Sequence, residues 1–301
     1  MMRFGVSAWR LTEGEVAGKE WRDNARRFAD SGYRTLWVAD HVGHPDPFPA
    51  LVAAADAAPG LRVGTYVLNA EFWNPLLLAR TAATVELMTD GRLTLGLGAG
   101  HNEAEFVQAG LRYPPPGERV ARLAALVPAL RRLLAGETVD DRALGLVGAA
   151  TGLPATSPRL LVGGNGDKVL AAGGRFADEV GLVGVTSGKT AIHTNLSHWG
   201  WDGLADRIAH TRAAAEEAGR SVRFDLLIQR ARVTDDRHGA VADFADAGPL
   251  DTVLDSPFLL VGSEDAIVEN LARASEMGVD GVTVFGPDAD ELAPVIARVR
   301  A

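Results

Sequence analysis

The chain has 301 residues, 47% of them hydrophobic and 23% charged, with a net charge of -9 at pH 7 and no cysteine. This composition is typical of a globular protein with a sizeable core and excludes disordered and collagen-like chains. The acidic balance argues against a nucleic-acid or anionic-membrane partner, because such surfaces attract basic proteins. The absence of cysteine rules out disulfides and thiolate metal sites and fits a cytoplasmic protein. Neither a secretory signal nor a membrane span is expected.

Short apolar runs alternate along the chain with longer segments of helical periodicity, which is the pattern of repeated strand–helix units. Eight strands are expected, at residues 3–8, 34–39, 62–68, 92–98, 159–164, 178–184, 222–229 and 281–286. Several are apolar on both faces, as in a parallel sheet that is covered on both sides. Eight such units predict a single α/β domain over residues 1–301, folded as a (β/α)8 barrel and not as an open doubly wound sheet.

Start and stop signals predict helices between the strands. Asn74 and Pro75 provide an N-cap and a first-turn proline for one helix, and Gly91 lies beyond its end. Ser263, followed by two acidic residues, opens another. Pro128 is expected to kink or divide the helix that contains it.

Polar residues follow several strands, where a barrel of this kind carries its chemistry. Asp40 and His41 end the second strand, and Asn69 and Trp73 follow the third. An imidazole titrates near neutral pH, so His41 is a candidate acid/base group. The alternative is a histidine that holds its loop by hydrogen bonds.

Two glycine-rich turns follow later strands. Residues 163–166 read GGNG between a strand and a helix, where backbone N–H groups and the helix dipole can hold a phosphate. The alternative there is an ordinary tight turn that uses glycine for positive φ. Residues 96–100 read GLGAG, which lacks the GxGxxG spacing and follows the fourth strand, so a dinucleotide-binding fold is not predicted.

Residues 136–158 and 185–201 interrupt the strand–helix rhythm, and loops of this length are usually functional or mobile. We interpret the second loop as an aromatic lid over a substrate, and we expect no metal there because no carboxylate accompanies its histidines at ligand spacing. The expected substrate contacts are Trp73, Lys189, His193, His198 and Trp201.

Four segments together resemble the luciferase-like oxidoreductases, and among them the branch that uses the deazaflavin coenzyme F420. They are residues 37–42 (WVADHV), 61–100 (LRVGTYVLNA to LGLGAG), 160–182 (LLVGGNGDKV to DEVGL) and 256–271 (SPFLLVGSEDAIVENL). Each is weak alone, whereas together they span most of the chain. The resemblance implies a TIM barrel with the cofactor ring at the carboxyl ends of the strands.

The resemblance also implies roles for particular residues. Asp40 and His41 contact the ring, and His41 is the proton partner of hydride transfer. The peptide bond between Tyr66 and Val67 is cis and packs behind the ring. Further cofactor contacts are expected after strands three, four and five, from Asn69, Gly98, Ala99, Gly100, His101, Gly163, Gly164, Asn165 and Gly166.

His101 departs from the family pattern, because sugar-phosphate dehydrogenases of the F420 branch carry a glutamate there that is thought to protonate the ring. The basic residues that hold the sugar phosphate in those enzymes have no clear match here either. Their substrate is therefore not implied for this chain.

The sequence thus predicts a coenzyme F420-dependent oxidoreductase that transfers a hydride between the deazaflavin and a small organic substrate. An FMN-dependent monooxygenase is the alternative, and the Asp40-His41 pair favours F420 over it because FMN relatives more often carry Glu-His at this place. A non-catalytic barrel homologue is a second alternative, and a metal-dependent hydrolase is disfavoured because the first strand has no His-x-His pair. A homodimer is expected, with the helices after strands two and three at its interface.

Overall fold

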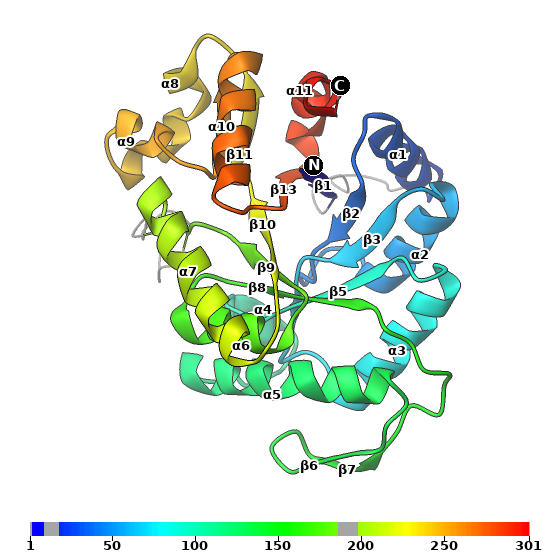
Figure 1. The fold of residues 1–301 in the computed structure, drawn as a ribbon. Helices are drawn as coiled ribbons and strands as arrows, with labels where there is room; N and C mark the ends of the chain where they lie inside the picture. Colours follow the sequence, from blue (N-terminus) through cyan, green and yellow to red (C-terminus); the bar gives the residue numbers. More distant parts are fainter. Residues whose placement is uncertain (1, 9–17, 186–197, 301) are drawn as a thin grey trace.

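Residues 2–8, 18–185 and 198–300 are described in the computed structural model of this protein. Their longest sheet is a parallel barrel (Figure 1), which closes because β3 pairs with β5 and β1 pairs with both β2 and β13. Its strands are β1 (Arg3–Ser7), β2 (Thr35–Val38), β3 (Arg62–Thr65), β5 (Leu93–Gly98), β8 (Arg159–Gly163), β9 (Glu179–Leu182), β10 (Arg223–Leu227) and β13 (Gly281–Phe285). Each lies within an expected strand, and the (β/α)8 barrel is confirmed.

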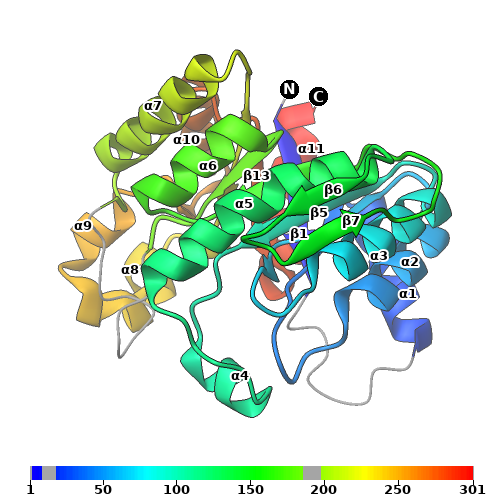
Figure 2. The same cartoon turned by 90° about the horizontal axis from the view of Figure 1, so that it is seen from below.

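Helices surround the barrel in Figures 1 and 2. They are α1 (Gly18–Asp30), α2 (Pro47–Ala57), α3 (Pro75–Met88), α5 (Pro116–Leu134), α6 (Asp167–Phe176), α7 (Trp201–Glu217), α10 (Glu264–Glu276) and α11 (Ala289–Arg300). The predicted caps are present: Asn74 accepts from the backbone N of Leu76 and Leu77, and Ser263 accepts from that of Ala266.

Pro128 was expected to kink or divide its helix, and the division is wrong because α5 continues through it. Proline removes one backbone donor from the helix. Buried apolar residues on both sides of it, among them Leu123, Leu126 and Leu130, hold the helix against the barrel. The burial of these side chains therefore outweighs the tendency of proline to end a helix.

Several smaller elements extend the strand–helix units. They are β4 (Leu68–Asn69), α4 (Glu103–Gln108), the hairpin of β6 (Val139–Asp141) and β7 (Leu146–Ala149), and the 3-10 helix η2 (Gly286–Asp288). The seventh unit contains an insertion that the sequence did not predict: β11 (Arg230–Val233), α8 (Arg237–Ala240), the 3-10 helix η1 (Ala242–Ala247), α9 (Leu250–Leu254) and β12 (Leu259–Gly262). In this insertion β11 and β12 pair as a separate parallel sheet.

Two aromatic side chains fill the middle of the barrel. The rings of Trp37 and Tyr66 meet edge to face with centroids 5.3 Å apart. Glycine on the neighbouring strands makes room for them: a Cβ on Gly5 or Gly64 would lie 2.5 Å from the Trp37 ring, and one on Gly181 would lie 2.2 Å from the Tyr66 hydroxyl. The groups at the carboxyl ends of the strands therefore stand on a packed interior.

Within the described part of the chain, no helix is both long and apolar enough to cross a membrane.

Candidate active site

His41 follows β2 and is held by a buried carboxylate. Its Nδ1 lies 2.6 Å from Oε1 of Glu105 on α4, a side chain that is only 10% exposed. The same Oε1 accepts a hydrogen bond from Nδ2 of Asn102 at 2.9 Å. A buried carboxylate in this position orients the imidazole and favours a proton on Nδ1.

Sequence reasoning missed Glu105. A signal was present, because Asn102 and Glu105 have the spacing of an N-cap and its third-position acid. Asn102 does cap α4, accepting from the backbone N of Ala104 at 3.2 Å. That spacing would have predicted a short helix directly after the fourth barrel strand and placed Glu105 at the same end of the barrel as His41.

Asp40 connects the end of β2 to the loop beyond β4. Its Oδ2 accepts from Nε1 of Trp73 at 2.8 Å and from the backbone N of Asn69 at 3.3 Å. Burial raises the pKa of Asp40, and these two hydrogen bonds oppose that rise. Trp73, which was expected to contact substrate, packs edge to face against Phe48 and fixes the Asp40 carboxyl.

The backbone at three strand ends packs closely around Val67. The Tyr66–Val67 peptide bond is cis, as the resemblance implies. A Cβ on Gly98 would lie 2.6 Å from Cγ2 of Val67, and one on Gly163 would lie 2.8 Å from its Cγ1. These two positions need glycine because no side chain fits between the strands here.

The turn after β5 lies against the end of β4. Gly100 has φ of +74°, and a Cβ there would lie 2.3 Å from Oδ1 of Asn69. Ala99 precedes it and is partly buried. His101 follows at the rim with its ring centroid 6.4 Å from that of His41. Loss of hydration, and then the neighbouring His41, lower the pKa of His101.

The turn after β8 contains a buried amide that lacks partners. Asn165 is 6% exposed, and neither its Nδ2 nor its Oδ1 has a hydrogen-bond partner within the described ranges. Gly164 leaves no room for a Cβ, which would lie 2.7 Å from Cγ1 of Val169, and Gly166 forms the N-cap of α6. Because buried polar groups are nearly always satisfied, the Asn165 amide and the N-terminus of α6 fit a bound oxyanion.

Arg207 of α7 supports this turn from behind. It donates to the backbone O of Asn165 at 3.4 Å and pairs with Asp167 and Asp206. His210, whose Nε2 lies 2.9 Å from the backbone O of Asp167, contributes after Arg207 to the lowered pKa of Asp167. His198, an expected substrate contact, precedes α7 and contributes less to the lowered pKa of Asp167 and Asp206.

Trp201, which was expected to contact substrate, is packed between two helices. Its ring is buried at the start of α7 and lies 4.0 Å from the guanidinium of Arg273 on α10. Trp199 is buried as well, and its ring stacks on that of Phe258 with centroids 5.8 Å apart. Core packing explains both rings, so neither forms the expected lid. Lys189 and His193 lie outside the described residues.

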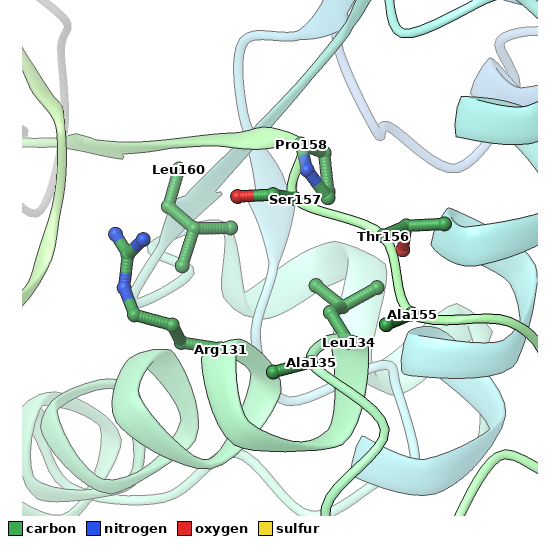
Figure 3. A pocket seen from close by; sticks show the side chains of 8 residues that line it. All are labelled: Arg131, Leu134, Ala135, Ala155, Thr156, Ser157, Pro158 and Leu160. Atoms are coloured by element: carbon green, nitrogen blue, oxygen red, sulfur yellow. The ribbon is translucent and has the colours of Figure 1, made fainter.

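Two cavities are lined by residues other than Asp40, His41 and Asn165. One of about 440 Å³ lies between the end of α5 and the segment that enters β8 (Figure 3). It is lined by Arg131, Leu134, Ala135, Ala155, Thr156, Ser157, Pro158 and Leu160. A groove of about 400 Å³ runs between α7 and α10 beside Trp201. Neither is lined by Asp40 or His41, so the chemistry of the strand ends is the better guide to the site.

The closed barrel, with its polar groups at the carboxyl ends of the strands, is that of a TIM-barrel protein. Residues 1–247 match the family described as luciferase-like monooxygenase. The chain belongs to this luciferase-like family.

The comparisons also give individual relatives. The chain is 24% identical over 306 residues to 5,10-methylenetetrahydromethanopterin reductase of Archaeoglobus fulgidus, which covers 89% of this chain and 91% of that protein. It is 30% identical over 149 residues to F420-dependent glucose-6-phosphate dehydrogenase of Amycolatopsis mediterranei, a match that spans 46% of this chain and 44% of the relative. A solved structure of F420-dependent secondary alcohol dehydrogenase, in complex with an F420-acetone adduct, superposes with a TM-score of 0.80 at 19% identity and covers 100% of this chain and 99% of that one. The relatives are thus oxidoreductases.

Proposed function

We propose that this single-domain chain is a coenzyme F420-dependent oxidoreductase that acts on a small organic molecule. The observation that carries the proposal is the pair Asp40 and His41, held by Glu105 and Trp73 at the carboxyl end of β2, next to a glycine-lined wall. F420-dependent relatives support the choice of cofactor. The absence of cysteine fits a reducing cytoplasm as its location.

The residues at the strand ends fit such a cofactor. Gly98, Gly100 and Gly163 let Val67 and Asn69 pack against the strand ends, which fixes the backbone beside Asp40 and His41. The unpartnered amide of Asn165 fits the phosphate of the cofactor. When bound, the deazaflavin supplies a carbon centre that accepts or releases a hydride.

The protein groups then have separate tasks. Glu105 fixes the orientation of the His41 ring, and His41 exchanges the proton that accompanies hydride transfer. Asp40, held by Trp73 and by the backbone N of Asn69, orients the ring of the cofactor. Proton transfer by a positioned side chain contributes roughly 10² to 10⁴-fold to the rate.

The test is a fluorescence titration of the purified protein with oxidised F420, reduced F420 and FMN. We expect saturable binding of F420 and weaker binding of FMN. Gly100→Val, whose side chain collides with Asn69, is expected to abolish F420 binding, whereas Gly110→Val, at an open glycine, serves as the control. Preferential FMN binding would contradict the proposal.

An FMN-dependent monooxygenase is the second candidate, and the description of the matched family favours it. A normal flavin passes electrons to oxygen, whereas a deazaflavin does not. Oxygen consumption with FMN and a reductant, measured in an oxygen electrode, distinguishes the two candidates.

We also propose a homodimer that forms through α3 and the adjoining hairpin. Leu77 and Met88, eleven positions apart on α3, are 48% and 62% exposed, and Val147 of β7 is 89% exposed. Eleven residues are about three helical turns, so Leu77 and Met88 lie on one face of α3. A second copy of the chain would bury this apolar surface.

A further inference from the structure

The barrel strands begin with a cluster of arginines, at the opposite end from His41. The arginine cluster consists of Arg3, Arg62, Arg159 and Arg223, the first residues of β1, β3, β8 and β10. Gly5 and Gly64, two positions further along β1 and β3, face Trp37 in the barrel interior. Because side chains alternate along a strand, Arg3 and Arg62 also point into the barrel.

Three of these arginines converge on one carboxylate oxygen. Oε1 of the buried Glu179 lies 2.9 Å from Nη1 of Arg3, 2.9 Å from Nη2 of Arg223 and 3.9 Å from Nη1 of Arg159. Arg159 has only this long contact and no hydrogen bond among the residues described. A single carboxylate balances one of the three charges.

The remaining groups do not restore the balance. Arg62 donates to the backbone O of Leu93 at 3.0 Å, and Glu86, on α3, accepts from the backbone N of that residue at 2.9 Å. Asp225 lies inside the barrel, where burial raises its pKa to about 7. Two further carboxylates directly precede barrel strands at this end: Asp178 pairs with Arg131 and Arg220, and Asp280 accepts from the backbone N of Phe224. With Arg131 and Arg220 included, six arginines at this end thus face five carboxylates, which are Glu86, Asp178, Glu179, Asp225 and Asp280.

Several N–H groups of the cluster are also unused. Nη2 of Arg3, Nε of Arg62 and Nε of Arg223 are buried and have no hydrogen-bond partner in the part of the chain that is described. The side chains of Arg3, Arg159 and Arg223 are nevertheless 31%, 37% and 38% exposed. Solvent therefore reaches the cluster from the amino-terminal end of the barrel.

We propose that this amino-terminal mouth of the barrel binds a compact oxyanion of the phosphate class. A tetrahedral oxyanion supplies the missing negative charge and accepts several hydrogen bonds from planar guanidinium groups. This site is separate from the proposed cofactor site, which lies at the other end of the same strands.

Calorimetric titration of the full chain with inorganic phosphate, at constant ionic strength, tests the proposal. Arg159→Gln removes a guanidinium that makes no hydrogen bond, and it is expected to weaken phosphate binding about tenfold. Arg223→Gln is a second variant with the same expectation. Arg298→Gln, at an exposed arginine paired with Glu264 and Asp265, is the matched control and should bind phosphate like the unaltered chain.

Thermal unfolding in a chloride buffer without phosphate establishes that each variant is folded. A parallel titration with glycerol phosphate distinguishes free phosphate from a phosphomonoester as the natural ligand, and tighter binding of either supports the site. No phosphate binding, or equal binding by Arg159→Gln, overturns the proposal. Loss of binding in Asn165→Ala alone also overturns it, because the phosphate then occupies the turn after β8.

Discussion

His41 and Glu105 are separated by 64 positions in the chain and by 2.6 Å between Nδ1 and Oε1. Such a pair can hold a proton at a defined place, which an isolated rim histidine cannot do as well. His101, edge-on to His41 at the rim, has no comparable carboxylate contact among the hydrogen bonds of the described residues. Of these two histidines, His41 is therefore the better candidate for the acid/base group.

Glu105→Gln is expected to lower turnover by about tenfold to a hundredfold while F420 binding is kept, because His41 loses the carboxylate that orients its ring. Glu103→Gln, at an exposed acid two residues earlier on α4, is the control. Steady-state kinetics should show the loss in kcat and not in KM. Equal kcat values for the two variants would remove Glu105 from the mechanism.

Asp225 gives a pH-dependent prediction about stability. Burial raises its pKa to about 7 in the folded chain, against roughly 3.9 when unfolded. The folded state binds the proton more tightly, so stability falls as the pH rises from 4 to 7. Asp225→Asn removes this loss and keeps an acceptor for the Thr283 hydroxyl. The unfolding free energy of the variant minus that of the unaltered chain should be about 2–3 kcal/mol larger at pH 8 than at pH 5.

Urea unfolding of both proteins at the two pH values measures this gain. Asp235→Asn, at an exposed aspartate, is the control and should show no such change. If the two proteins differ in unfolding free energy by the same amount at both pH values, Asp225 does not titrate in this range.

At the scale of elements, a side-chain cap fixes where one helix begins, and burial keeps another helix continuous. Asn74 accepts two backbone hydrogen bonds at the start of α3, and Pro75 follows it in the first turn. α5 instead continues through Pro128 because its apolar face is buried on the barrel. A local stop signal thus gives way where tertiary burial is extensive, and a local start signal acts where the helix end is exposed.

Asn74→Ala is expected to reduce the unfolding free energy by about 1 kcal/mol, because two backbone N–H groups lose their acceptor. Thr84→Ala, at an exposed position on the same helix, is the control and should change it by less than about 0.5 kcal/mol. Chemical denaturation measures both. Equal losses of unfolding free energy in Asn74→Ala and Thr84→Ala would show that the cap contributes little to stability.

At the scale of the whole molecule, the barrel strands separate the two proposed sites. The carboxyl ends hold Asp40 and His41, and the amino ends hold the arginine cluster. The outer apolar face of α3 belongs to neither end, so a second copy of the chain can cover it without blocking either opening.

Leu77→Glu combined with Met88→Glu is expected to convert a dimer into a monomer, because two charges would be buried at the interface. Val107→Glu, at an exposed apolar residue on α4, is the control and should remain dimeric. Sedimentation velocity measures the mass. A monomeric unaltered chain would contradict the proposed interface.

The amino-acid sequence by itself determined the eight strands, the caps at Asn74 and Ser263, and the class of fold. These features depend on local periodicity and on side chains that bond to their own backbone, so neighbouring residues are enough to encode them. The inserted strands and helices between β10 and α10 escaped prediction, because short elements carry little periodic signal.

Only the tertiary structure decided the partner of His41, the role of Trp73 and the burial of Trp201. Each depends on how loops from different strands meet, at Glu105, Asp40 and Arg273 respectively. The same holds for the arginine cluster: the sequence shows single arginines before apolar runs, and closure of the barrel brings their charges together. Long-range contacts of this kind follow from the path of the whole chain, which local patterns do not specify.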